Sequence, residues 1–183
     1  MGMHTTNYHV VAVNQASVPD EGLRQIWGQL VAEEKVGSLF YSGGIATWSA
    51  FLSLLRSPDI AACVVVEMST GRPVLLAWLT NVSAGSAFVH YATLGRPRRD
   101  AGRALLAYWD SLVDDSGEPL LEVLLGITPE HHVDAVRVMR IMGFVSLAVI
   151  PRYCVVTRST GRVGGVLSCR ERCSSARDLR GPV

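Results

Sequence analysis

The chain of 183 residues has little charge: charged side chains make up 18% of it and apolar ones 49%. That balance excludes disorder across most of the chain, because disordered segments combine high charge with low hydrophobicity. No apolar run reaches the ~20 residues that a membrane helix needs, and residues 1–9 lack the basic and apolar regions of a secretory signal. We therefore expect one main domain, located in the cytoplasm and not embedded in a membrane.

Cysteine is also sparse, and its spacing excludes the usual zinc patterns. The four residues are Cys63, Cys154, Cys169 and Cys173, and the x-x-x spacing of the last two is not that of a metal-binding pair. Two of the four lie in apolar runs typical of a protein core. We expect reduced thiols and no bound metal.

Lysine is nearly absent, since Lys35 is the only one among 17 basic residues. The net charge of +1 argues against nucleic-acid binding by the whole domain. Residues 1–157 carry 11 basic and 14 acidic side chains, a net of −3, whereas residues 158–183 carry six arginines and two acids, a net of +4. Glycine, serine and arginine dominate this second segment. We therefore predict a fold over 1–157 and a tail with little ordered structure over 158–183, which would be the one part able to bind a nucleic acid.

Hydrophobic periodicity predicts a strand, two helices, a three-stranded meander and then helices that alternate with strands. The strands are expected at 8–13, 60–68, 74–80, 86–94, 120–127, 144–150 and 153–157. The helices are expected at 20–37, 45–55, 102–113 and 133–142, with Gly37 ending the first and Thr128-Pro129 starting the last. This order predicts an α/β (α+β) fold with a mixed, mostly antiparallel sheet flanked by helices.

Four arginines lie within eight residues between a predicted strand and helix, at positions 96, 98, 99 and 103. Small residues at 101, 102 and 104 allow a ligand to approach the backbone closely. The free N–H groups of the following helix, with the positive end of its dipole behind them, suit a phosphate. The alternative is a solvated arginine loop that only caps the helix.

Two motifs bear a family likeness. Arg99-x-x-Gly102-x-Ala104 resembles the acyl-CoA pyrophosphate loop of the GNAT (GCN5-related N-acetyltransferase) family. Downstream, a strand at 121–124 followed by His132-x-x-Ala135 and a helix ending in Gly143-Phe144 is similar to the second signature of that family. The resemblance covers residues 8–157.

The resemblance implies a GNAT fold in which strands 86–94 and 120–127 splay apart to admit acetyl-CoA. It also implies which residues contact this co-substrate: Leu94 beside pantetheine, Arg99, Asp100, Ala101, Gly102, Arg103 and Ala104 around the pyrophosphate, and His132 at the family's usual asparagine position. The implied reaction is direct attack of an amine, on a small molecule or a protein, on the thioester. A base, donors to the oxyanion and an acid for the thiolate would assist it.

The chain departs from this pattern at Met139, which stands where many members have a tyrosine acid, and methionine cannot donate a proton. The alternative hypothesis is therefore a catalytically inactive GNAT-fold module for binding or assembly, with or without bound CoA. His90 is the candidate base, since the ordinary pKa of histidine suits proton transfer near neutrality. The alternative is that His90 is a structural histidine in a half-buried strand.

Other roles stay open. Tyr91 and Tyr153 either supply a hydroxyl or pack. Trp27 and Trp48 either shape the acceptor pocket or belong to the core. Edge strands near the C-terminus offer a route to a homodimer.

Overall fold

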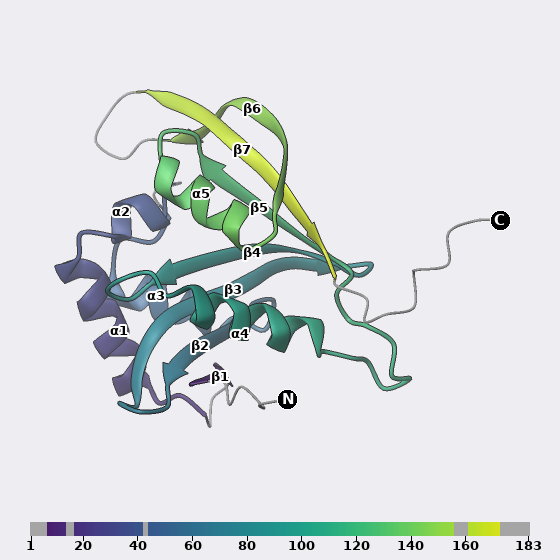
Figure 1. Ribbon diagram of the computed structural model, residues 1–183. Helices are drawn as coiled ribbons and strands as arrows, with labels where there is room; N and C mark the ends of the chain where they lie inside the picture. The colour runs from purple at the N-terminus through teal and green to yellow at the C-terminus, as the bar shows by residue number, and fades with distance from the viewer. Residues whose placement is uncertain (1–6, 14–16, 42–43, 156–160, 173–183) are drawn as a thin grey trace.

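The part of the chain that a computed structural model describes, residues 7–13, 17–41, 44–155 and 161–172, forms a seven-stranded sheet with helices on both faces (Figure 1). The strands are β1 (Tyr8–Ala12), β2 (Ala61–Glu67), β3 (Arg72–Ser83), β4 (Ser86–Thr93), β5 (Val123–Pro129), β6 (Val145–Val155) and β7 (Arg162–Glu171). The helices are α1 (Asp20–Ala32), α2 (Val36–Leu39), α3 (Trp48–Leu55), α4 (Arg99–Asp110) and α5 (Val133–Ile141). The predicted fold class and the meander of β2, β3 and β4 are confirmed.

The strand order is β1-β2-β3-β4-β5-β7-β6, and all neighbours are antiparallel except β4 and β5. These two parallel strands pair only over residues 86–88, opposite residues 123–125. Both strands continue beyond that point without pairing to each other, β4 to Thr93 and β5 to Pro129. The predicted splaying of the central strands is therefore confirmed.

Each face of the sheet has its own hydrophobic core. Trp78 lies opposite His90 in the β3–β4 ladder, on the face that α1 and α3 cover. Ala77 lies opposite Tyr91, on the face that α4 and α5 cover. Since side chains alternate along a strand, the odd-numbered residues of β4 face α4 and α5, and the even-numbered ones face α1 and α3.

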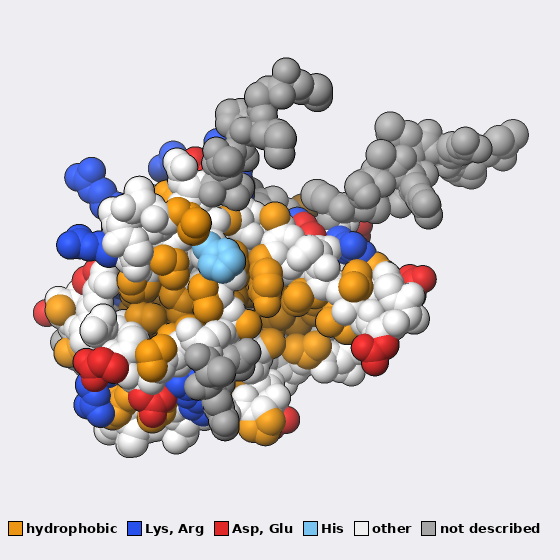
Figure 2. All heavy atoms as spheres, turned by 90° about the horizontal axis from the view of Figure 1, so that it is seen from below, with side chains coloured by type: hydrophobic (Ala, Val, Ile, Leu, Met, Phe, Trp, Pro, Cys, Tyr) orange, Lys and Arg blue, Asp and Glu red, His pale blue; other side chains and the backbone are white. Residues whose placement is uncertain are grey.

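The core under α4 reaches the surface beside β1. Tyr8, Val10 and Tyr108 are half-buried and pack against this core. Figure 2 shows the underside of Figure 1, where hydrophobic side chains gather over these elements and charged ones lie around them. A hollow of about 240 Å³ lies there between β1, β2 and α4. β2 and β3 separate β1 from the opening between β4 and β5.

Helix α1 ends earlier than the sequence predicted. Glu34, rather than Gly37, takes the left-handed conformation after the helix, with φ of 54°. The N–H of Glu34 donates to the Val31 carbonyl at 3.0 Å and that of Lys35 to the Leu30 carbonyl at 2.9 Å. This pair of bonds is a Schellman motif, in which glycine usually stands at the position of Glu34. The prediction of Gly37 as the terminator was wrong, because the chain turns at Glu34 and then enters α2.

Three other boundaries differ from the prediction. Helix α3 starts at Trp48, not at 45, because the Thr47 hydroxyl accepts the Ala50 N–H at 3.3 Å and caps the helix there. β5 runs through Thr128 and Pro129, so these residues do not start α5, which begins after His132. β6 is one strand with an irregular register between 150 and 154, not two.

The prediction of little ordered structure after residue 157 was wrong for 162–171, which form β7 between β5 and β6. Gly164 and Gly165 are buried, and an added Cβ at Gly164 would lie 2.7 Å from a Glu130 carboxylate oxygen. Arg170 is also buried and makes two hydrogen bonds to Asp110 at the end of α4, at 2.9 and 2.5 Å. Glycine and arginine here serve packing in the sheet. The rest of the predicted tail, 158–160 and 173–183, lies outside the described residues.

None of the helices in the described ranges has the length and apolar character that crossing a membrane requires.

Candidate functional site

An opening of about 630 Å³ lies where β4 and β5 separate. Its wall includes Val89 and Tyr91, which face α4 and α5, and also His90, which faces α1 and α3. Helix α2 contributes Ser38 on one side of the sheet, and α5 contributes Met139 on the other. Because residues of both faces line it, the opening passes through the sheet.

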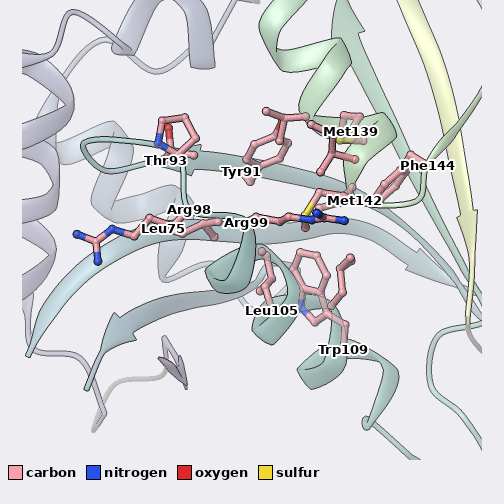
Figure 3. Close-up of a pocket in the computed structure, with 16 residues that line it drawn as sticks. Leu75, Tyr91, Thr93, Arg98, Arg99, Leu105, Trp109, Met139, Met142 and Phe144 are labelled. Atoms are coloured by element: carbon pink, nitrogen blue, oxygen red, sulfur yellow. The ribbon is translucent and has the colours of Figure 1, made fainter. Parts of the chain in front are cut away.

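A second pocket of about 370 Å³ adjoins the opening on the side of α4 and α5 (Figure 3). Its wall is mostly apolar, and its polar side chains are those of Tyr91 and Thr93 in β4 and of Arg98 and Arg99 at the start of α4. Val89, Tyr91 and Met139 line both this pocket and the opening, so the two are neighbours. We call it the α4 pocket.

A third pocket of about 570 Å³ lies on the other side, beside α1 and α2. It shares Ser38, Tyr41, His131 and His132 with the opening. We call it the α1–α2 pocket. The three spaces together connect the start of α4, through the sheet, with the surface near α1 and α2.

The start of α4 presents backbone donors to the α4 pocket. Arg98 precedes the helix in an extended conformation, and no side chain caps it. The Gly102 N–H donates to the Arg98 carbonyl at 3.3 Å, which is the first bond of the helix. The N–H groups of Arg99, Asp100 and Ala101 therefore have no partner within the helix, whereas those of Arg103 and Ala104 follow in the regular pattern. Of the six residues at 99–104 that are predicted around the pyrophosphate, only these three therefore have a backbone N–H that is free of the helix.

The arginines around this turn are not equivalent. Arg98 pairs with Glu67 of β2, and Arg103 pairs with Asp100 at 3.3 Å. Arg99 has no ion-pair partner within the described ranges, and Figure 3 shows its side chain pointing toward Met142, opposite to that of Arg98. The uncompensated positive charge at the pocket is therefore that of Arg99.

Gly102 is small for a packing reason that the sequence does not show. A Cβ there would lie 2.5 Å from the sulfur of Met142, just after α5. A larger residue at position 102 would therefore displace the end of the Met142 side chain, apart from any approach of a ligand.

The backbone of β4 supplies polar groups to the opening. The Leu94 N–H donates to the Val74 carbonyl of β3 at 2.9 Å, and the side chain of Leu94 is buried. The Leu94 N–H therefore points to β3 and away from β5, and the contact of the backbone near Leu94 with pantetheine stays a prediction. Since backbone groups alternate in direction along a strand, those of Tyr91 and Thr93 point toward the β5 side instead.

Lys35 holds the end of β4 in place through its side chain. The sequence shows that it is the only lysine but does not predict this contact. Its ammonium donates to the Thr93 carbonyl at 2.7 Å and lies 2.6 Å from the Glu33 carboxylate. Glu33 in turn accepts the Gly95 N–H at 3.0 Å. Burial alone would raise the pKa of Glu33, but the hydrogen bonds from Lys35, Gln29 and Gly95 lower it overall.

His90 lies in the wall of the opening, as a candidate base must. Its Nε2 is 3.0 Å from the Thr80 hydroxyl, and its ring stacks on Trp78 with centroids 5.2 Å apart. Burial lowers its pKa from 6.5, so the imidazole is neutral at pH 7.

The next residue, Tyr91, lies on the opposite face. Its hydroxyl donates to the Ala135 carbonyl of α5 in a long bond of 3.4 Å, and burial raises its pKa to about 12. Met139 lies one turn further along α5 and is buried, close enough to β5 that an added Cβ at Gly126 would be 2.4 Å from its methyl group. The position where many members of the GNAT family have a tyrosine thus holds the apolar side chain of Met139, and the hydroxyl of Tyr91 lies near it.

His132 precedes α5 and lines both the opening and the α1–α2 pocket. Its ring meets that of His131 edge to face with centroids 4.1 Å apart. Burial and the neighbouring His131 lower its pKa. His132, the predicted co-substrate contact, therefore also faces the α1–α2 pocket. Within the described residues, no cluster of three or more His, Cys, Asp or Glu side chains forms a metal-binding group.

Comparison of the sequence with family models and with curated proteins finds no match. Comparison of the structure with solved structures finds many. One is spermidine N-acetyltransferase from Vibrio cholerae in complex with CoA and spermine, with a TM-score of 0.69 and 12% identity over 91% of this chain and 96% of that one. Another is ribosomal-protein-S5-alanine acetyltransferase from Vibrio fischeri, with a TM-score of 0.66 and 11% identity over 92% and 94%.

A third is RimJ from Mycobacterium smegmatis in complex with CoA-disulfide, with a TM-score of 0.66 and 14% identity over 90% of this chain and 86% of that one. At such low identity the likeness concerns the fold alone. The chain has the fold of the GNAT acetyltransferases, as the two motifs predicted.

Proposed function

We propose that the protein is an acyl-CoA-dependent N-acyltransferase that transfers an acetyl group from acetyl-CoA to an amine. The observation that carries the proposal is the opening through the sheet, which connects an anion-binding helix start with a pocket on the opposite side. The structural neighbours support it, since one of them is an N-acetyltransferase in complex with CoA and spermine and another is in complex with CoA-disulfide.

The residues at the start of α4 fit a pyrophosphate. Three backbone N–H groups, the helix dipole and the guanidinium of Arg99 all present positive charge there. The pantetheine arm would then run along β4, where the backbone of Tyr91 and Thr93 offers the polar groups that its amides need. Its thioester would reach the opening beside Val89 and Met139.

The reaction is direct attack. The amine nitrogen forms a bond to the thioester carbon, the carbon–sulfur bond breaks, and the sulfur leaves as a thiolate. Neutral His90 accepts the proton that the amine loses, because it lines the opening on the side of the α1–α2 pocket. Tyr91 supplies a proton or hydrogen bond to the thiolate, because its hydroxyl lies on the other face and its raised pKa keeps it protonated.

A second candidate function is a CoA-binding module without catalysis, favoured by the buried Met139 at the usual tyrosine position. The two differ in turnover. In both cases acetyl-CoA should raise the Tm, but only the enzyme should release CoA thiol when an amine is added.

The test combines both measurements. Arg99→Glu should abolish the rise in Tm with acetyl-CoA, because it reverses the uncompensated charge at the pocket. Arg137→Glu is the matched control, an exposed arginine of α5 that lines none of the three spaces. No rise in Tm for the wild type at millimolar acetyl-CoA would refute both functions. A rise without thiol release for any amine would leave only the binding module.

A further inference from the structure

The α1–α2 pocket has an unusual combination of side chains. Its wall combines apolar and aromatic side chains with the polar side chains of Glu34, Ser38, His131 and His132. The apolar and aromatic ones come from α1, α2, the following residues and the end of β6: Trp27, Val31, Val36, Tyr41 and Val155. Val31 is 51% exposed and Val155 36%, so their apolar surface faces the pocket and solvent rather than the core. Among the described lining residues, Glu34 is the only one with a carboxylate.

Glu34 occupies a backbone position that disfavours it. Its φ of 54° is left-handed, and the Schellman motif it belongs to prefers glycine there. A side chain with a Cβ destabilises this conformation, since the Cβ crowds the following carbonyl. Strain of this kind tends to persist where a side chain serves a site.

The carboxylate of Glu34 has no basic partner within the described part of the chain. Its neighbour Glu33 is the acid that pairs with Lys35. The arrangement therefore leaves one acid in the wall of a pocket that combines aromatic, apolar and polar side chains, and His131 and His132 line both this pocket and the opening.

We propose that the acceptor is a small primary amine with a single positive charge and an aromatic or branched apolar body. Glu34 attracts the ammonium group, and the rings of Trp27 and Tyr41 take up the body as the nitrogen passes into the opening. A polyamine does not suit this pocket, because each further ammonium group would need its own acid when it leaves water. This inference rests on the proposed N-acyltransferase function.

The first experiment measures kcat/KM by CoA thiol release for 2-phenylethylamine, isoamylamine, spermidine and a peptide with an N-terminal alanine. The wild type should favour the two monoamines over spermidine and the peptide by about tenfold or more, the effect of one unpaired or lost charged hydrogen bond. A preference for spermidine or the peptide overturns the inference and leaves the proposed function intact. Absence of turnover with all four, with acetyl-CoA still raising the Tm, counts against catalysis itself.

The second experiment separates a role in binding from a role in folding. Glu34→Gly should raise the Tm by about 2–4 °C, because it relieves the left-handed strain, and should raise the KM for 2-phenylethylamine about tenfold. Glu34→Gln should raise the KM similarly without the gain in Tm. If both variants keep the wild-type KM, Glu34 does not bind the acceptor and the inference fails.

Two control variants complete the design. Ala84→Gly relieves a left-handed residue, with φ of 47°, in the turn between β3 and β4, and should raise the Tm without changing the KM. Glu21→Gln removes an exposed acid in the first turn of α1 that lines none of the three spaces, and should change neither KM nor specificity. An equal rise in KM for Glu21→Gln would attribute the effect to the overall charge and overturn the role of Glu34.

Discussion

The ion pair between Asp110 and Arg170 should hold β7 in the domain, and Asp110→Asn tests this. Arg170 is 8% exposed and the side chain of Asp110 is 22% exposed, with two hydrogen bonds between them. Helix α4 carries a second acid in an ion pair, Asp100 with Arg103, in which both side chains are more than half exposed. The same substitution at the two acids therefore compares a buried pair with an exposed one on one helix.

Removing one partner of a buried pair destabilises a protein by about 3–5 kcal/mol, because the remaining charge stays out of water. Asparagine keeps some hydrogen bonding and Asp110 is partly exposed, so we expect about 3 kcal/mol for Asp110→Asn. For Asp100→Asn we expect less than about 1 kcal/mol, as is usual for surface pairs. In a domain of this size the first loss corresponds to a fall in Tm of about 6–12 °C.

Thermal or urea unfolding followed by circular dichroism measures both variants. The double variant Asp110→Asn/Arg170→Met should recover part of the loss, because it removes the buried guanidinium charge as well. Equal shifts for Asp110→Asn and Asp100→Asn would refute the argument, since β7 would then not depend on a buried charge pair.

Three further variants address the site. Activity should fall as the pH is lowered through a value below 6.5, because burial lowers the pKa of His90 and only its neutral form accepts a proton; His90→Gln should abolish that limb of the pH profile, and an inflection above 6.5 would contradict the assignment. Tyr91→Phe should lower kcat by about 10–100-fold with little change in the Kd for acetyl-CoA by calorimetry, whereas an unchanged kcat would exclude the hydroxyl from the reaction. Lys35→Met should weaken acetyl-CoA binding several-fold in the same assay, because the end of β4 loses its bond at the Thr93 carbonyl and Glu33 loses its partner; unchanged binding would show that the bond is dispensable.

The lowered pKa of His90 should also make the stability of the fold depend on pH. In the folded protein burial lowers the pKa of His90, whereas in the unfolded chain this histidine has its ordinary pKa of 6.5. The unfolded state therefore binds more protons than the native state below that pH, and the free energy of unfolding should decrease as the pH falls through 6.5. His90→Gln should flatten this dependence in urea unfolding at pH 5 and pH 8, and an unchanged slope would assign it to other groups.

Local patterns predicted most elements before β7, because period and turn chemistry act over a few residues. They failed at β7, whose glycines and arginines resemble a disordered segment. Its order comes from pairing with β5 and β6 and from the contact of Arg170 with Asp110, 60 positions away. Composition cannot report a contact at that separation.

The sequence predicted the elements around the candidate site but not the direction of the backbone groups in β4. The motifs around Arg99 and Gly102 located the helix start, and the sequence placed His90 in the correct strand. The N–H of Leu94 donates to the Val74 carbonyl of β3, so it points away from β5. A one-residue change in register reverses the direction of every backbone and side-chain group in a strand, and the two motifs do not say which backbone groups of β4 pair with β3.

The same alternation gives the proposed mechanism its geometry. His90 and Tyr91 are adjacent in β4, so their side chains lie on opposite faces of the sheet. The amine would arrive from the α1–α2 pocket, where His90 can take its proton, and the thiolate would leave on the α4 side, where Tyr91 can supply one. Two neighbouring residues of one strand thus separate the base from the acid across the sheet. In the proposed mechanism the acid comes from β4 instead of α5, which would leave position 139 free to hold an apolar side chain. Met139 fills the space against Gly126 that a tyrosine would have to share.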